Sequence, residues 1–181
     1  MKFLPTGLTG AVVIEPEPLR DERGSFSRTF CREEFRAHGI ELTVVQCSVS
    51  FNVRRGTLRG LHYQAPPKAE AKLVRCTAGE AFDVIADLRP GSPTFGRWFA
   101  TELTAAGGRM IYVPEGFAHG FQTLRDETEL FYMVSESYSP PHARGVRWDD
   151  PQLGIRWPMA PTVMSARDRE LPALDQAGPL C

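Results

Sequence analysis

The chain has 181 residues, of which 42% are hydrophobic and 24% are charged, and its formal net charge is −1. These values are typical of a globular protein, and we expect a single domain over residues 1–181. The near-neutral charge argues against a nucleic-acid-binding protein, although a local basic cluster could hold a small anionic ligand. No segment approaches the ~18 apolar residues of a membrane span, and the N-terminus lacks the apolar centre of a signal peptide. We therefore expect a cytoplasmic protein that does not bind membranes.

Short β-rich segments separated by Gly, Pro and Asp follow one another along the chain. The predicted strands are 11–16, 24–30, 42–51, 72–77, 81–88, 97–103, 110–113, 118–124 and 129–135, with 59–64 as a further candidate. This spacing indicates an all-β sandwich or barrel rather than βαβ units. One short helix is predicted over 32–38 and another after Ser165. The segment 138–161 contains Trp148 and Trp157, and we expect it to pack across the barrel.

Residues 54–75 form the densest group of polar side chains, RRGTLRGLHYQAPPKAEAKLVR. In a regular strand alternate side chains share a face, so Arg59 and His62 would face opposite sides. Both could contact one ligand only if Gly60 marks a bulge. The alternative is a solvated basic edge strand with an ordinary, half-buried His62, and spacing alone favours that interpretation.

Three further residues have both a structural and a functional interpretation. His119 lies in an apolar strand, so we expect it to be buried and hydrogen-bonded, because an unpaired buried imidazole costs about 1–3 kcal/mol. Tyr132 is either a core tyrosine or a phenol facing a cavity. Asp168, near the second predicted helix, is by itself a helix cap or a surface charge. A cupin-type metal site uses an HxH pair, which is missing after His62, so we expect a metal-free barrel.

Six segments in order resemble the dTDP-4-dehydrorhamnose 3,5-epimerase family: RGLHYQ, EAKLVRCTAGEAFDVIADLRPGSPTFG, VPEGFAHGF, FYMVSESYSP, WDDPQLGIRWP and SARDRELP. They extend from about Asp21 to Pro172, and together they are more specific for the family than for one substrate. The resemblance implies a cupin-like double-stranded β-helix, or jelly roll, with short peripheral helices. It also implies an isomerase without metal or organic cofactor, and a homodimer in which an N-terminal strand contributes to the partner's site.

By the same resemblance, the substrate is a nucleoside-diphosphate 4-keto-6-deoxyhexose, inverted at carbon 3, carbon 5 or both. His62 would be the base, Asp168 would orient it, Tyr132 would be the acid on the opposite face, and Lys72 would stabilise the enolate oxygen. Arg59 and the partner's Arg23 would hold the diphosphate. The remaining implied substrate contacts are Arg28, Gln46, Ser48, His119 and Arg167.

These residue types suit the implied chemistry. A histidine cannot remove a proton next to a ketone unaided, because that proton is far less acidic than an imidazolium. A cation near the oxygen where charge develops lowers the barrier, and Lys72 could supply it. A histidine also has nearly the right basicity for a base near neutral pH. Arginine forks match the charged oxygens of a diphosphate.

Three positions depart from the family pattern. Arg28 stands where RGxFxE ends in glutamate, residues 46–50 read QCSVS instead of QDNHS, and Ala143 lies near an expected glutamate. The pattern places all three among contacts to the nucleotide or sugar, so one hypothesis is a relative acting on another nucleotide sugar or on one carbon only. The rival interpretations are a 3- or 5-mono-epimerase, a non-catalytic sugar-nucleotide-binding cupin and a metal-dependent cupin oxygenase or isomerase.

Overall fold

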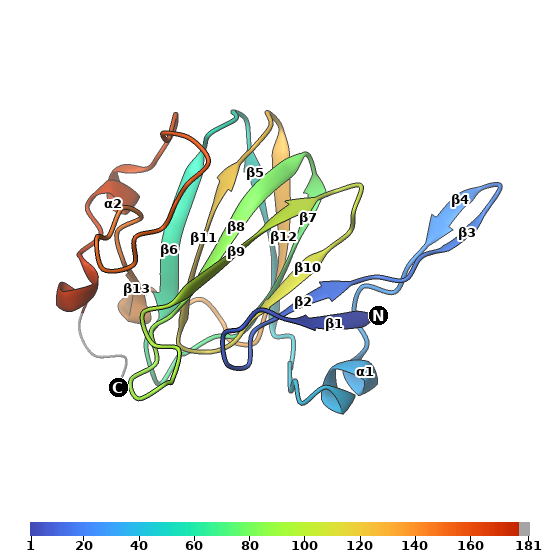
Figure 1. Cartoon of the computed structure of the whole chain (residues 1–181), viewed down its shortest axis with the longest axis horizontal. Coiled ribbons are helices and arrows are strands. Elements are labelled where there is room, and N and C mark those ends of the chain that lie inside the picture. The colour runs from blue at the N-terminus through green and yellow to red at the C-terminus, as the bar shows by residue number, and fades with distance from the viewer. Residues whose placement is uncertain (178–181) are drawn as a thin grey trace.

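Two antiparallel sheets face each other in the computed structural model, which describes residues 1–177 (Figure 1). The six-stranded sheet has the order β1 (Lys2–Pro5), β2 (Val12–Glu15), β10 (Met110–Val113), β7 (Lys72–Ala78), β12 (Thr128–Val134) and β5 (Gln46–Asn52). The five-stranded sheet has the order β13 (Ala143–Gly145), β6 (Leu58–Gln64), β11 (Phe117–Thr123), β8 (Glu80–Asp87) and β9 (Trp98–Thr104). The predicted cupin-like jelly roll is confirmed, and so is the candidate strand at 59–64.

The errors in the predicted strands lie mostly at the N-terminal end and at the sheet edges. The segment 24–30 contributes only β4 (Gly24–Phe26), which pairs with β3 (Leu19–Asp21) in a separate hairpin. The strand predicted from residue 42 begins instead at Gln46, because Leu42 packs into the cluster around α1 (Arg32–Ala37). Strands β1, β3 and β13 have no predicted counterpart.

Alternation along the strands divides the apolar side chains between an inner core and two outer layers. Val74, Leu130 and Phe121 belong to the core shared by the two sheets. Outside the six-stranded sheet, Phe35 of α1 joins a second cluster. Outside the five-stranded sheet, Trp157 packs on Phe82 with ring centroids 6.1 Å apart, as predicted for the segment 138–161. The inner face therefore carries both this apolar core and the polar side chains described below.

The C-terminal part of the chain contains only short helical turns. The 3₁₀ turns are η1 (Pro140–His142) and η2 (Leu174–Gln176), and between them lies α2 (Ala166–Arg169). The predicted N-cap of α2 is confirmed, since the Ser165 hydroxyl accepts the backbone N–H of Asp168 at 3.1 Å. Within residues 1–177, no helix is both long enough and apolar enough to cross a membrane.

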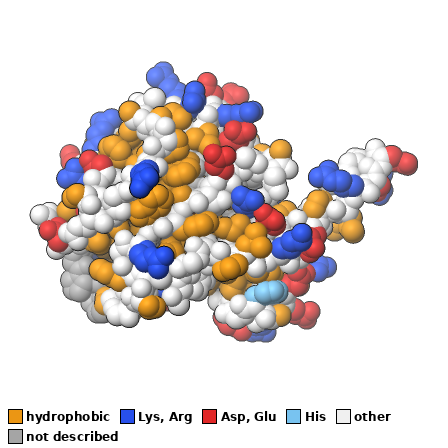
Figure 2. All heavy atoms as spheres, in the orientation of Figure 1, with side chains coloured by type: hydrophobic (Ala, Val, Ile, Leu, Met, Phe, Trp, Pro, Cys, Tyr) orange, Lys and Arg blue, Asp and Glu red, His pale blue; other side chains and the backbone are white. Residues whose placement is uncertain are grey.

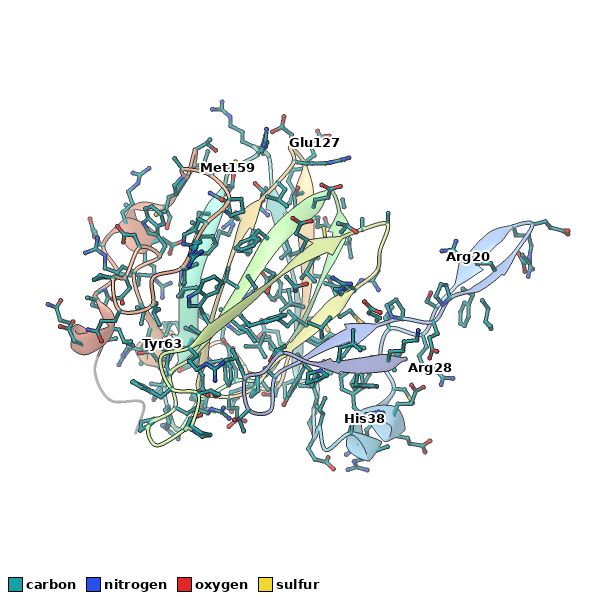
Figure 3. The ribbon with its side chains drawn as sticks, in the orientation of Figure 1. Arg20, Arg28, His38, Tyr63, Glu127 and Met159 are labelled. Atoms are coloured by element: carbon teal, nitrogen blue, oxygen red, sulfur yellow. The ribbon has the colours of Figure 1, made fainter. Side chains whose placement is uncertain are left out.

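The β3–β4 hairpin, here called the arm, projects away from both sheets (Figure 1). Figure 2 shows basic, acidic and hydrophobic side chains along it, and Figure 3 places Arg20 on it. Its two largest apolar side chains are solvent-exposed, Leu19 at 73% and Phe26 at 75%. An isolated hairpin of this kind is at best marginally stable in water.

Asp87, at the end of β8, fixes the loop that follows it. Its buried carboxylate accepts hydrogen bonds from Arg89 at 2.7 Å and from Ser92 and Thr94 at 2.6 Å each. Burial acts to raise the pKa of Asp87, but these hydrogen bonds outweigh it and lower the pKa to about 2. The carboxylate therefore stabilises the fold fully above its ordinary pKa, and this contribution is lost as the pH falls toward 2.

Asp87→Asn should lower the free energy of unfolding at pH 7 by about 2 kcal/mol, since one pKa unit corresponds to about 1.4 kcal/mol. The difference from wild type should shrink as the pH falls from about 4 toward 2. Urea denaturation over this range measures both effects. Asp149→Asn is the control, because its partner Arg147 is exposed and the pair should contribute little. A pH-independent loss in Asp87→Asn would contradict the prediction.

Candidate active site

An irregularity in β6 brings Arg59 and His62 to the same side of the sheet. Between β11 and β6, His119 lies opposite His62 and Phe121 lies opposite Arg59, so β6 contains one extra residue. Gly60 provides the bend with a φ of +125°, and a Cβ there would lie 2.5 Å from the Cα of Gly120. Only glycine fits this position. The bulge that the sequence analysis required is therefore confirmed.

His62 forms a short contact with a buried carboxylate. Its Nε2 lies 2.7 Å from Oδ1 of Asp168, whose other oxygen accepts the backbone N–H of Gly60 at 3.3 Å. Burial favours a higher pKa for Asp168, but the hydrogen bonds from His62 and Gly60 outweigh it and hold the pKa below its ordinary value. An ionised Asp168 accepts a hydrogen bond from Nε2–H of His62, which leaves the unprotonated Nδ1 of that tautomer free to act as a base. Asp168 is thus not a surface charge.

His119 is buried and paired with a second carboxylate. Its Nε2 lies 2.8 Å from Oδ2 of Asp83, which is fully buried on β8. Burial raises the pKa of Asp83 despite the opposing charges of His119 and Lys72. Asp83 is not among the predicted site residues, although a carboxylate on the inner face between Ala81 and Ile85 is a visible signal in a buried strand.

Tyr132 approaches this pair from the opposite sheet. Its ring centroid lies 5.8 Å from that of His119, in an edge-to-face arrangement. Desolvation raises the pKa of Tyr132 above its ordinary value, the charge of Asp83 raises it further, and Arg59 opposes both. The phenol therefore stays protonated. Ser48 lies directly opposite Tyr132 on β5, so it shares the inner face.

Lys72, at the start of β7, is 8% exposed, and its Nζ lies 3.0 Å from Oε1 of Glu70. The sequence analysis did not identify Glu70. Its spacing of two residues from Lys72 was the available signal, because residues i and i+2 of an extended segment share a face. The structure thus places a carboxylate, which was not predicted, beside the ammonium group of Lys72.

Arg59 lies at the edge of the site. Its Nε donates to Oδ1 of Asn52 at 2.7 Å, and its guanidinium is exposed to solvent. It lines a groove of about 420 Å³ together with Phe51, Asn52, Val53, Arg54, Thr57 and Val163. A guanidinium held beside an open groove is suited to an anionic group.

The other predicted contact residues are more scattered. Gln46 is exposed on β5 and accepts the backbone N–H of Tyr138 at 3.2 Å, while Arg167 is exposed on α2 beside Asp168. Arg23 pairs with Asp21 in the arm, and Arg28 pairs with Glu34 at 3.0 Å outside the barrel (Figure 3). Within one chain, neither Arg23 nor Arg28 joins the inner group.

No group of three or more His, Cys, Asp or Glu side chains within residues 1–177 is arranged to hold a metal ion. The site instead presents two imidazole–carboxylate pairs, a protonated phenol and an ammonium, contributed by both sheets and, for Asp168, by α2. A jelly roll with these acid–base groups belongs to the class of cupin-fold isomerases.

The chain belongs to the dTDP-4-dehydrorhamnose 3,5-epimerase family, whose model matches residues 5–176. It is 44% identical to dTDP-4-dehydrorhamnose 3,5-epimerase from Sinorhizobium fredii, over 96% of this chain and 90% of that one. It is 39% identical to dTDP-4-dehydrorhamnose 3-epimerase from Streptomyces niveus, over 98% and 86%. A crystal structure of the 3,5-epimerase from Bacillus anthracis with TDP and PPi bound matches with a TM-score of 0.92 and 42% identity, over 95% and 98%. The family resemblance seen in the sequence is confirmed.

Proposed function

We propose that this single-domain chain is a dTDP-4-dehydrorhamnose 3,5-epimerase, which inverts carbons 3 and 5 of a dTDP-4-keto-6-deoxyhexose. The observation that carries the proposal is the placement of a base and an acid on facing sheets around His119. His62 lies directly opposite His119 on the neighbouring strand, and the ring of Tyr132 lies 5.8 Å from that of His119. One sugar ring could therefore lie between the imidazole and the phenol.

The reaction follows from these positions. Nδ1 of His62 removes the proton from a carbon next to the ketone, and the bonding electrons move onto the carbonyl oxygen to form an enolate. The ammonium of Lys72 stabilises the charge that develops on this oxygen. Asp168 stabilises the imidazolium, while Tyr132 donates its proton to the opposite face of the same carbon. His62 then releases the proton it has taken to solvent, and Tyr132 takes up a proton from solvent, so both residues return to their starting states before the cycle is repeated at the second carbon.

We assign binding of the sugar nucleotide to residues at the solvent-exposed edge of the active site and to inner residues beside it. Arg59 holds the diphosphate with Arg23 of the partner subunit, because guanidinium forks pair with phosphate oxygens. Lys72 contacts the ketone oxygen, and the other proposed substrate contacts are Arg28, Gln46, Ser48, His119 and Arg167. The bound TDP of the Bacillus anthracis relative supports a thymidine nucleotide.

Incubation with dTDP-4-keto-6-deoxyglucose in D₂O tests the function. NMR should show one deuterium at carbon 3, one at carbon 5 and an inverted product. Exchange at a single carbon would indicate a mono-epimerase, as the name of the Streptomyces niveus relative describes. Faster exchange with another nucleotide would support altered nucleotide recognition at Arg28 and Ala143. Binding of the sugar nucleotide without any deuterium exchange would refute the proposal that the chain is an enzyme. Loss of activity on addition of a chelator would indicate a metal-dependent enzyme.

We also propose a homodimer in which the arm of one chain covers the other. Its support is the arm's exposed Leu19 and Phe26, together with the edge strand β5, where Val49 and Phe51 are more than half exposed. Apolar side chains repeated along a sheet edge mark an interaction surface.

The double substitution Leu19→Asp with Phe26→Asp should convert the dimer to a monomer, since it places charges in the proposed interface. It should also lower kcat/KM, because Arg23 would no longer contact the partner's substrate. Light scattering after gel filtration measures the mass. Phe95→Asp is the control, as Phe95 is 50% exposed in the loop after Asp87. A double variant that remains dimeric would contradict this arrangement.

A further inference from the structure

The ion pair between Lys72 and Glu70 differs from a surface salt bridge. Its side chains are only 10% and 13% exposed, and Nζ and Oε1 are 3.0 Å apart. Lys68 and Glu136, a nearby pair 3.3 Å apart, are 43% and 29% exposed. Solvent screens an exposed pair and makes it weak, whereas two partly desolvated charges depend strongly on each other. The charge of Lys72 should therefore depend on Glu70.

The backbone holds Glu70 in place beside Lys72. Ala71, between them, donates its N–H to Oγ of Ser135 at 2.8 Å and accepts the N–H of Ser135 at 3.0 Å. These two bonds tie the end of the loop to the residue that follows β12. The carboxylate is thus fixed at the start of β7.

The other titratable groups near Lys72 on the inner face have different partners. Asp83 of β8 lies near enough to feel the charge of Lys72, but it is hydrogen-bonded to His119 of β11. Tyr132 of β12 lies opposite Val74, two residues along the same face from Lys72. Among the described residues, Glu70 is the carboxylate in ion-pair contact with Nζ of Lys72.

We propose that Glu70 is a positioning residue for Lys72, which keeps the ammonium charged and holds Nζ on the inner face where the enolate oxygen forms. The inference rests on the enolate-stabilising role of Lys72 in the proposed function. A lysine amine stabilises an oxyanion only while it is protonated, and desolvation favours its neutral form. A facing carboxylate opposes that loss of charge. Glu70 thus acts through Lys72 rather than on the substrate.

The lysine content makes a direct test practical, since the chain has only Lys2, Lys68 and Lys72. Protein labelled with ¹³C at lysine Cε gives three NMR signals, which Lys2→Arg and Lys68→Arg assign. In Glu70→Gln the titration midpoint of Lys72 should move to lower pH by about one unit or more. Glu136→Gln is the matched control, because it removes the partner of Lys68 and should leave the midpoint of Lys72 unchanged.

Activity connects this titration to the reaction. In Glu70→Gln, the alkaline limb of the kcat/KM profile should move to lower pH by the same interval as the Lys72 midpoint. Glu70→Asp, which keeps the charge, should restore most of the shift, and circular dichroism should show that both variants are folded. An unchanged midpoint in Glu70→Gln would overturn the proposal. If the titration midpoint of Lys72 shifted but the alkaline limb of the kcat/KM profile did not, the catalytic part of the proposal would be overturned. Lack of epimerase activity in the wild type would refute the proposed function instead, and the NMR titration would still decide whether Glu70 sets the charge of Lys72.

Discussion

His62→Asn should lower kcat about 10³-fold and suppress deuterium exchange at both carbons. Nδ1 of His62 is the proposed base, and an asparagine of similar size cannot accept the proton near neutral pH. The magnitude lies within the roughly 10²–10⁴-fold range of general acid–base catalysis. NMR in D₂O measures exchange at carbon 3 and carbon 5 separately.

The control for this substitution is His38→Asn. His38 is an exposed imidazole stacked on Phe3 beside α1, outside the barrel (Figure 3). The His38→Asn variant should catalyse deuterium exchange at the wild-type rate. If His62→Asn also kept the wild-type rate, the base would have to be another residue, and His119 would be the next candidate.

Tyr132→Phe should separate proton removal from inversion. The raised pKa of Tyr132 keeps its phenol protonated, so this residue is suited to donate a proton rather than to remove one. Its loss should slow net inversion about 10²-fold or more. Exchange through His62 should fall much less, because the protonated His62 can exchange its proton for a deuteron from solvent and return that deuteron to the same face. The ratio of exchange to inverted product is the measurement.

Tyr63→Phe is the matched control for this variant. Tyr63 lies on the outer face of β6, and its hydroxyl donates to the backbone oxygen of Ala177 at 3.3 Å. Its removal should leave the ratio of exchange to inversion unchanged. A Tyr132→Phe variant with the wild-type ratio would show that the phenol does not deliver the proton.

The sequence predicts the central strands well because their alternation reflects burial against a core. It does not predict β1 and β13, since their pairing with β2 and β6 depends on residues that only the fold brings together. It also does not predict the three-residue strand β3 of the arm. The same limit explains the error at residue 42. Leu42 has an apolar side chain and lies next to a β-rich segment, as a strand residue would, but it is buried in the cluster around α1. The local pattern of apolar residues predicts that a side chain is buried, but it does not show which part of the protein covers that side chain.

The candidate site shows a similar division. The local pattern gives His62, Tyr132 and Asp168 both a structural and a functional interpretation, and only the family resemblance assigns catalytic roles to them and to Lys72. Their pairing could not be predicted, because the contact between His62 and Asp168 joins residues 106 positions apart. Glu70 lies close to Lys72 in the sequence, yet only the folded loop shows that its carboxylate faces the ammonium.

The extra residue in β6 determines which side chains can meet a substrate. If β6 kept all its residues but ran as a regular strand without the bulge at Gly60, it could still pair with β11, yet either Arg59 or His62 would face away from the barrel interior. The stability of this strand depends on its backbone pairing, whereas its chemistry depends on the bulge. Flattening this one bulge could therefore leave a well-folded barrel that binds or reacts but no longer does both.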